Sequence, residues 1–524
     1  MDKRHSPKRS RSIPQLRLIN IALALTITFL LAILVLGAVV IAGLRLTGFE
    51  RFSSEPVLTS KTFFELLKIA FAFSGGAAAL VGLVMVYRRQ RTAEAAEGRE
   101  QIKLFNDRFA AIAEQLGHEH AASRLAGVYA LAGLADDAVT WEQRQTCIDV
   151  LCANLRLPAL DDDGDLEVRH TIIRLITSHL RPEAMTSWCS HNLDFTGVVF
   201  KGGDFSGAIF SGMHTSFSGA RFIAGETSFR GAVFAHGSVS FEKADFESAS
   251  VDFSESKFDG SRVSFRKCVM SGGILRLNHA RLFSGMVIFD EAEMSDGQIR
   301  LEDVKIRGGA LSFNNVQFGG GKALFGRASF ARGQVSFSGA QFFGTETSFA
   351  NGIFCGASIY FDHCRFTDGD ISFDRAKFDN GTISFDSARL AGAGVSFTFA
   401  RFAGSAFSFR YASFPVGITS FSDARFLSGV LSFANAEVAG GDVVFDRALF
   451  AGTSVDFEKA WLSDGRVSFE DAEMTGGLID LSSATFSGAT VDFGRVIRCV
   501  QGCLIAPWAT TRIGLVAPPS SATE

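Results

Sequence analysis

A large apolar residue recurs every twelve residues over more than half of this chain. Steps of twelve from Phe205 reach Phe493 after 24 repeats without an insertion or a deletion. Phenylalanine occupies every step except three, which are Leu277, Leu301 and Leu481. A second apolar residue follows each of these anchors by five positions, as far as the anchor at Leu481. Spacings of five and seven fit neither a helix face nor the alternation of one long strand, and an unbroken period predicts a solenoid.

The residues around each anchor indicate short strands separated by corners. The position two before the anchor is β-branched or apolar, as at Val239, and shares a strand face with the phenylalanine. Between them lies an outward residue that is often serine, such as Ser240, and glycines such as Gly237 mark the corners. We therefore expect a structural core ladder that includes Phe217, Phe222, Phe229, Phe234, Phe241 and Phe246.

The stretch GVVFKGGDFSGAIF, which ends at Phe210, has phenylalanines at a strict spacing of five and resembles the pentapeptide-repeat family. That resemblance implies a right-handed quadrilateral β-helix over residues 190–493, with the central residue of each unit inside. Two residues are added after every second group of five, so two 12-residue units would form one coil of 24 residues. A single 12-residue coil stays open as the alternative, although two phenylalanines with Ala and Val seem to need more interior volume than it offers.

The first ninety residues predict a transmembrane hairpin. No charge interrupts the 25 residues from Asn20 to Leu44, and a second apolar run extends from Ile69 to Tyr87. We expect a basic cytosolic tail over 1–17 and a hairpin over 18–91, with two transmembrane α-helices near 20–44 and 67–87. Basic flanks predict a multi-pass protein of the inner (cytoplasmic) membrane, with both termini and the repeats in the cytoplasm. A buried soluble hairpin is the alternative.

Residues 92–185 predict a small α-helical domain of four amphipathic helices, the third capped by Thr140 and the fourth ending at Pro182. Residues 494–524 are expected to cap the last coil and then to be disordered. The order of these parts, with the motifs SRLAGVYAL and VRHTIIRLITSHLRP, resembles membrane-anchored actinobacterial pentapeptide-repeat proteins.

The chain carries no recognisable catalytic or cofactor motif. We predict that it is not an enzyme, with no catalytic residue, no cofactor-binding residue and no metal ligand. His118 and His120 could suggest a metal site, but a solvated turn after a helix is the stronger interpretation. The run Asp161–Asp165 lacks the glutamate that a calcium loop needs at its twelfth position. Eight cysteines without a C-x-x-C pair indicate reduced, packed thiols.

Composition favours binding over catalysis. The predicted function is a cytosolic, membrane-anchored scaffold for protein–protein interaction, with the lipid bilayer and an unknown protein as partners, and with homo-oligomer formation left open. No direct nucleic-acid binding is expected. Because some pentapeptide-repeat proteins mimic DNA and inhibit gyrase, the alternative is a DNA mimic. Between Glu437 and Asp492 there are 11 acids against three bases. The candidate partner surface there consists of Asp456, Glu458, Asp464, Glu470, Asp471 and Glu473.

Overall fold

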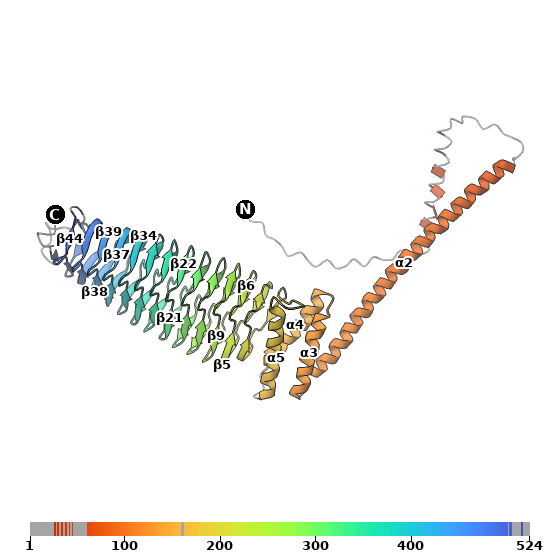
Figure 1. The fold of residues 1–524 in the computed structure, drawn as a ribbon, viewed down its shortest axis with the longest axis horizontal. Helices are drawn as coiled ribbons and strands as arrows, with labels where there is room; N and C mark the ends of the chain where they lie inside the picture. The colour runs from red at the N-terminus through yellow and green to blue at the C-terminus, as the bar shows by residue number, and fades with distance from the viewer. Residues whose placement is uncertain are drawn as a thin grey trace. The chain divides into compact units, whose positions relative to one another are not determined.

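The computed structural model describes residues 60–158 and 162–500 continuously, with scattered positions between 26 and 45 and between 502 and 516. The chain divides into two units, Met1–Asp107 and Arg108–Glu524. The second unit contains a helical segment followed by a long β-solenoid, in which coils stack one on the next (Figure 1).

One helix, α2, runs without a break from Ser60 to Leu116. The sequence predicts a separate helix that begins near Arg99, so this part of the prediction differs from the structure. The reason is local, because Ala, Glu, Gln and Arg between Arg88 and Arg99 are strong helix formers and no proline or capping residue interrupts them. At the end of α2, Ile112 and Leu116 are buried.

The predicted transmembrane hairpin over 18–91 is contradicted. No helix within the described residues is both long and apolar enough to cross a membrane. Between 62 and 78 only some side chains are described, and from Ala79 onward the apolar run ends at Tyr87, before Arg88. Those nine residues rise only about 14 Å, against the roughly 30 Å of a hydrocarbon core. Most of the first predicted span, 20–44, lies outside the described residues. The predicted placement in the cytoplasmic membrane is contradicted by the same finding.

Three further helices precede the solenoid: α3 (Ala121–Asp136), α4 (Trp141–Arg156) and α5 (Asp163–Leu180). Thr140 caps α4 as predicted, because its side chain accepts a hydrogen bond from the Gln143 amide in a reciprocal capping box. α5 begins earlier than expected, since the Asp162 side chain accepts from the Asp165 amide. The acidic run after Pro158 is therefore partly a helix start.

Four short strands form each coil, and equivalent strands of successive coils pair in parallel to make four ladders. The first ladder contains β3 (Ile209–Phe210), β6 (Val233–Ala235), β10 (Lys257–Asp259), β14 (Arg281–Leu282), β18 (Lys305–Ile306), β22 (Ser329–Ala331), β26 (Ile353–Cys355), β30 (Lys377–Asp379) and β44 (Arg498–Cys499). The second contains β1 (Leu193–Asp194), β4 (His214–Ser216), β7 (Ser238–Ser240), β11 (Arg262–Ser264), β15 (Met286–Ile288), β19 (Ala310–Ser312), β23 (Gln334–Ser336), β27 (Ser358–Tyr360), β31 (Thr382–Ser384) and β45 (Leu504–Ile505). Four longer strands continue both ladders around their common corner: β34 (Arg401–Ser408), β37 (Arg425–Ser432), β39 (Leu449–Asp456) and β41 (Glu473–Asp480). We call these two ladders sheet A.

The other two ladders form sheet B. The third ladder contains β8 (Asp245–Phe246), β12 (Val269–Ser271), β16 (Glu293–Ser295), β20 (Gln317–Gly319), β24 (Gln341–Phe343), β28 (Arg365–Thr367), β32 (Arg389–Ala391), β35 (Ser413–Val416) and β42 (Thr485–Phe486). The fourth contains β9 (Ser250–Asp252), β13 (Ile274–Arg276), β17 (Gln298–Arg300), β21 (Lys322–Leu324), β25 (Glu346–Ser348), β29 (Asp370–Ser372), β33 (Gly394–Ser396), β36 (Ile418–Ser420), β43 (Thr490–Asp492) and β46 (Leu515–Val516). Longer strands that continue both are β2 (Val199–Asp204), β5 (Arg221–Ser228), β38 (Glu437–Val444) and β40 (Trp461–Ser468).

The coil length is 24 residues, so the prediction of about twelve 24-residue coils is confirmed and the 12-residue coil is wrong. Phe234 pairs with Phe258 and Val239 with Val263, each 24 residues apart. The first coil is shorter, because Phe200 pairs with Phe222. This is the stretch where the phenylalanines are spaced strictly by five, without the added pair. Right-handed winding stays a prediction.

Phenylalanine rings fill the inside of the solenoid. Phe217 stacks on Phe241 with ring centroids 4.6 Å apart, and Phe222 stacks on Phe246 at 4.9 Å. Between the two anchor columns the rings meet edge to face, as for Phe217 and Phe229 at 5.4 Å. The six expected core residues are all buried: Phe217, Phe222, Phe229, Phe234, Phe241 and Phe246. The interior of the described coils is therefore a packed core.

Coil spacing fixes glycine at some corners, and Gly321 provides a test. Its φ is +68°, and a Cβ there would lie 2.1 Å from the carbonyl oxygen of Gly297 in the preceding coil. We expect Gly321→Ala to lower the free energy of unfolding by about 1–3 kcal/mol, measured by urea denaturation. Gly326→Ala is the matched control, because its nearest neighbour would be the Ala350 oxygen at 3.8 Å. Equal effects of the two substitutions would contradict this account.

Candidate functional site

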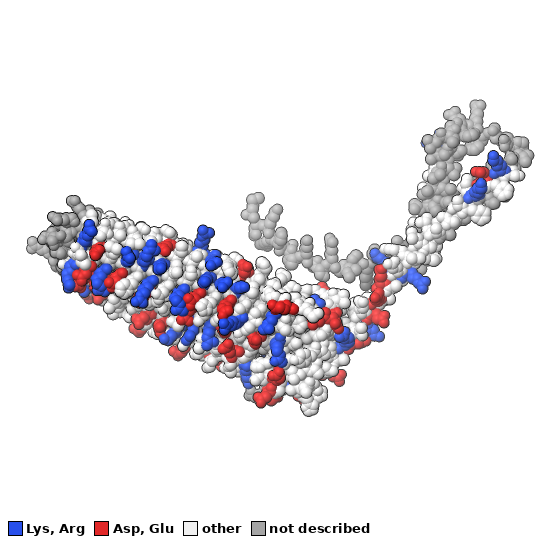
Figure 2. All heavy atoms as spheres, in the orientation of Figure 1, with Lys and Arg blue, Asp and Glu red and all other residues white. Residues whose placement is uncertain are grey.

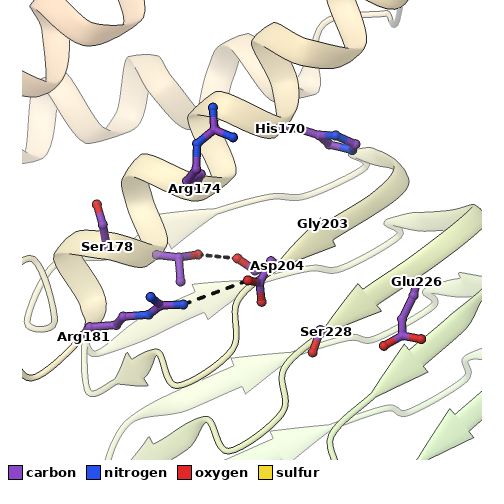
Figure 3. A pocket seen from close by; sticks show the side chains of 9 residues that line it. His170, Arg174, Ser178, Arg181, Gly203, Asp204, Glu226 and Ser228 are labelled. Atoms are coloured by element: carbon purple, nitrogen blue, oxygen red, sulfur yellow. Dashed lines mark hydrogen bonds and ion pairs between the residues drawn. The ribbon is translucent and has the colours of Figure 1, made fainter.

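A groove of about 470 Å³ lies where α5 meets the first coils of the solenoid (Figure 3). One wall is the exposed face of α5, and the other is formed by β2 and β5. The lining residues are His170, Arg174, Thr177, Ser178, Arg181, Gly203, Asp204, Glu226 and Ser228. Three of them are basic or can be protonated and two are acidic, so the groove carries charges of both signs.

Most polar groups on the α5 wall are engaged with the backbone of the first coil. Thr177 donates a hydrogen bond to the Asp204 carbonyl oxygen at 2.8 Å, and His170 Nε2 lies 3.1 Å from the carbonyl oxygen of Lys201. Arg181 donates from Nε and Nη2 to the Ser206 carbonyl oxygen, at 3.2 and 3.1 Å. These contacts attach α5 to the solenoid, which makes the groove first of all a structural junction.

The same arrangement extends around the edge of the first coil. The Gln145 amide group of α4 donates to the Asn192 carbonyl oxygen at 2.9 Å and accepts from the Asn192 amide at 3.0 Å. Arg156 donates to the Asp194 carbonyl oxygen at 3.0 Å. We call these α4 and α5 side chains the helical cap: Gln145, Arg156, Arg169, His170, Thr177 and Arg181. An uncovered solenoid edge would leave a row of unpaired backbone groups, and the helical cap pairs six of the first-coil residues.

Arg169 is the most deeply placed member of the helical cap. It is 7 % exposed and donates to the carbonyl oxygens of Leu155 at 2.7 Å, Val199 at 3.0 Å and Leu157 at 3.3 Å. Burial lowers the pKa of Arg169, an effect that the charge of Asp165 opposes. Its guanidinium thus joins α4, α5 and β2, and its five donors suit a site with several carbonyl oxygens.

A Ser–His–Asp series beside the groove has the wrong hydrogen bonds for nucleophilic catalysis. His179 Nε2 lies 3.0 Å from the Asp136 carboxylate, while its Nδ1 lies 2.7 Å from the Leu175 carbonyl oxygen. Ser178 also donates to the Leu175 oxygen, at 2.8 Å. Since both ring nitrogens face acceptors, neither is free to take a proton from Ser178. The Trp188 ring stacks on His179 with centroids 4.0 Å apart, which completes a packed structural cluster.

The buried cysteines are poor nucleophiles. Burial raises the pKa of Cys147 to about 11, and of Cys152 and Cys268 to about 12. Burial also raises the pKa of Cys364. A thiol with such a pKa holds its proton at neutral pH, and the thiolate is the reactive form.

The two histidines that sequence analysis weighed as metal ligands form a turn. His118 Nδ1 accepts a hydrogen bond from the His120 amide at 3.1 Å, and their rings lie 5.1 Å apart. In the part of the chain that the structure describes, no three His, Cys, Asp or Glu residues are grouped so that they could hold a metal ion.

The six acidic candidates do not form one surface. Asp456 and Glu458 lie at the turn that leads from sheet A (β39) to sheet B (β40). Glu470 and Asp471 follow β40, at the opposite turn of the coil, where the chain returns to sheet A. Asp464 lies within β40, and Glu473 begins β41.

Basic neighbours also neutralise part of this acidic end. Arg495 lies 2.7 Å from Glu470 and 3.6 Å from Asp471, and Lys459 lies 3.2 Å from Glu458. Acidic and basic side chains alternate over the outer surface in the view of Figure 2. A row of like charges, which DNA mimicry requires, is therefore absent from these six residues.

His191 gives the helical segment a dependence on pH. The side chain is 2 % exposed and stacks on Trp141 with centroids 5.1 Å apart. Burial, and to a lesser degree the charge of Arg144, lowers the pKa of His191 from its usual value near 6.5. The unfolded chain has the higher pKa and takes up a proton first, so the stability present above about pH 6.5 is lost as the pH falls below that value.

We expect His191→Phe, which keeps a ring beside Trp141, to lose less stability than the wild type between about pH 8 and about pH 5. Urea unfolding at a series of pH values measures the difference. Wild-type and variant curves of equal slope would show that His191 does not cause the pH dependence.

The sequence did not predict the helical cap, although it contained a signal. Arg169, His170, Thr177 and Arg181 interrupt the apolar side of α5 at positions that share one face of the helix. Only the position of that helix against the first coil shows that these polar groups meet backbone carbonyls.

No protein-family model matches this chain, and no curated protein matches it. The relation to pentapeptide-repeat proteins therefore rests on geometry, since four-sided coils of 24 residues with inward phenylalanines are consistent with that fold.

Proposed function

We propose that this protein is a non-enzymatic scaffold that binds other proteins on the outer faces of its solenoid. The repeat β-solenoid fold fits a scaffold or interaction protein. One observation carries the proposal: the interior is filled with phenylalanine, so the variable residues are on the outside, at positions that repeat in every coil.

Ion pairs between successive coils hold many outer side chains in place. Three Arg–Asp pairs, each with a separation of 24 residues and a distance of 2.7 Å, are Arg327–Asp303, Arg410–Asp386 and Arg447–Asp423. In each pair the aspartate is the less exposed partner, and the arginine lies above it in the next coil. Side chains ordered before binding lose less entropy in a complex, which supports a role in recognition.

DNA mimicry receives no comparable support. The acidic residues that would carry it lie on opposite turns and are partly paired with Arg495 and Lys459. We therefore propose protein binding alone.

The experiment that tests the scaffold is affinity capture on the full-length chain, followed by titration of each captured protein in purified form. We expect at least one protein to bind with a fixed stoichiometry and a Kd at or below about the micromolar range. Substitution of outward residues should weaken this binding and leave thermal unfolding unchanged. The proposal fails if no purified protein binds, or if binding is unaffected by every outward substitution.

A further inference from the structure

Six basic side chains gather on sheet A over four consecutive coils. Lys257, Arg281 and Lys305 occupy the same register position of β10, β14 and β18. Arg262 lies in β11 of the first of these coils, Arg307 follows β18, and Arg332 follows β22. We call these six residues the basic patch: Lys257, Arg262, Arg281, Lys305, Arg307 and Arg332. All six are exposed.

The basic patch has no counter-ions of its own. None of its six side chains is paired with a carboxylate among the described residues, although neighbouring turns contain close pairs such as Arg327–Asp303. Asp259 is the one acid on these strands and corners, and its Oδ1 accepts a hydrogen bond from Ser284 at 2.9 Å. Stacked strands lie about 4.8 Å apart, so like charges in this column repel one another unless an anion lies between them.

Apolar side chains are exposed between these cations. Phe283 is 37 % exposed and Met286 is 40 % exposed, and Arg262 Nη1 lies 3.7 Å from the Met286 sulfur. A hollow of about 140 Å³ is lined by Arg281, Phe283, Lys305 and Arg307. Arginine, methionine and aromatic residues are the types enriched at protein–protein interfaces. This mixture fits a protein better than a phosphate backbone or lipid headgroups, which offer no apolar side chains to Phe283 and Met286.

A shallow trough of about 620 Å³ runs along the corner beside the basic patch, past Arg262 and Met286. Its floor is made of small residues that backbone packing requires, since a Cβ on Gly309 would lie 2.8 Å from the Gly285 carbonyl oxygen. The trough is thus a product of the fold, and the partner is indicated by the charged and apolar side chains at its rim. From Lys257 to Arg332 the basic patch covers three coil spacings, about 14 Å, which four or five residues of an extended chain would span.

We propose that the basic patch binds an acidic segment of a partner protein that also carries apolar residues. The carboxylates would lie among Lys257, Arg281 and Lys305, and an apolar side chain would contact Phe283 and Met286. This inference rests on the proposed scaffold function and names the chemistry of one of its partners.

The first test uses fluorescence anisotropy with the full-length chain and a labelled poly-glutamate peptide. We expect Arg281→Glu/Lys305→Glu/Arg307→Glu to weaken binding by at least about tenfold. The matched control, Lys243→Glu/Arg365→Glu/Arg389→Glu, makes the same change of charge at exposed positions outside the basic patch. We expect it to weaken binding less than about threefold. Thermal unfolding of both variants verifies that they are folded, and equal losses of affinity would overturn the proposal.

The second test separates a protein partner from other polyanions. A peptide in which alternate glutamates are replaced by leucine should bind more tightly than poly-glutamate, and Phe283→Ala/Met286→Ala should remove that gain. Duplex DNA and phosphatidylserine vesicles are the competing probes. Tighter binding of either one at the basic patch, or no gain from leucine, would overturn the proposal. If a captured protein binds another face while poly-glutamate does not bind here, the scaffold function stands and this inference falls.

Discussion

Replacement of Phe342 by alanine should lower the free energy of unfolding by about 3–5 kcal/mol, the largest effect expected of any single core substitution here. Phe342 is 1 % exposed and lies in the middle of a column, with Phe318 and Phe366 stacked on its two faces at 4.8 Å. Truncation leaves a cavity between two rings that the hydrogen-bonded coils hold apart, so the site cannot collapse to fill it.

The adjacent residue gives a matched control. Phe343 is the same residue type in the same strand, β24, but it points outward and is 40 % exposed. Phe343→Ala should therefore change the free energy of unfolding by less than about 1 kcal/mol. Urea denaturation followed by circular dichroism measures both variants. Because each coil contacts only its neighbours, hydrogen exchange should show the loss of protection concentrated around β20, β24 and β28. Similar effects at 342 and 343 would mean that the side chains are not placed as described.

The second large effect is expected at the helical cap. Arg169→Met keeps much of the side-chain volume but removes the donors to three carbonyl oxygens, those of Leu155, Leu157 and Val199. Buried carbonyls without a partner are unfavourable, and we expect a loss of roughly 2–4 kcal/mol. Once α5 loosens from β2, the edge of the first coil becomes available to other chains, so the variant should also aggregate.

Arg174→Met is the control for this experiment, since Arg174 is exposed on the same helix and pairs with Glu167 at 3.3 Å. It should change stability by less than about 1 kcal/mol. Denaturant unfolding gives the free energies, and light scattering at a series of protein concentrations detects association. A stable, monodisperse Arg169→Met protein would contradict the assignment of Arg169 to the cap.

The repeats were predictable because they depend on short-range spacing. Phe234 and Phe258 are one coil apart, and their pairing follows from a period that can be counted along the chain. Even the shortened first coil, in which Phe200 pairs with Phe222, corresponds to a visible change from alternating fives and sevens to strict fives.

Segments without a repeat were predicted less well. Composition near Ile69–Tyr87 suggested a transmembrane span, but the described part of α2 supplies no run that could cross a membrane. The acidic count between Glu437 and Asp492 suggested one surface, yet a half-coil step of twelve residues takes the chain to the opposite turn, which separates Asp456 from Glu470. Charge counted along a sequence does not show which faces the charges occupy.

By itself the sequence determined the coil, its core and the outward positions, because a strict period leaves one arrangement in which every large ring is buried. Only the tertiary structure decided what happens between coils and at their end. The helical cap joins Arg169 to Val199, 30 residues along the chain, and the basic patch joins Lys257 to Arg281 and Lys305 through the ladder register. These contacts depend on how backbones stack in space, and hydrogen bonding of an open edge and repulsion between like charges act across that stack.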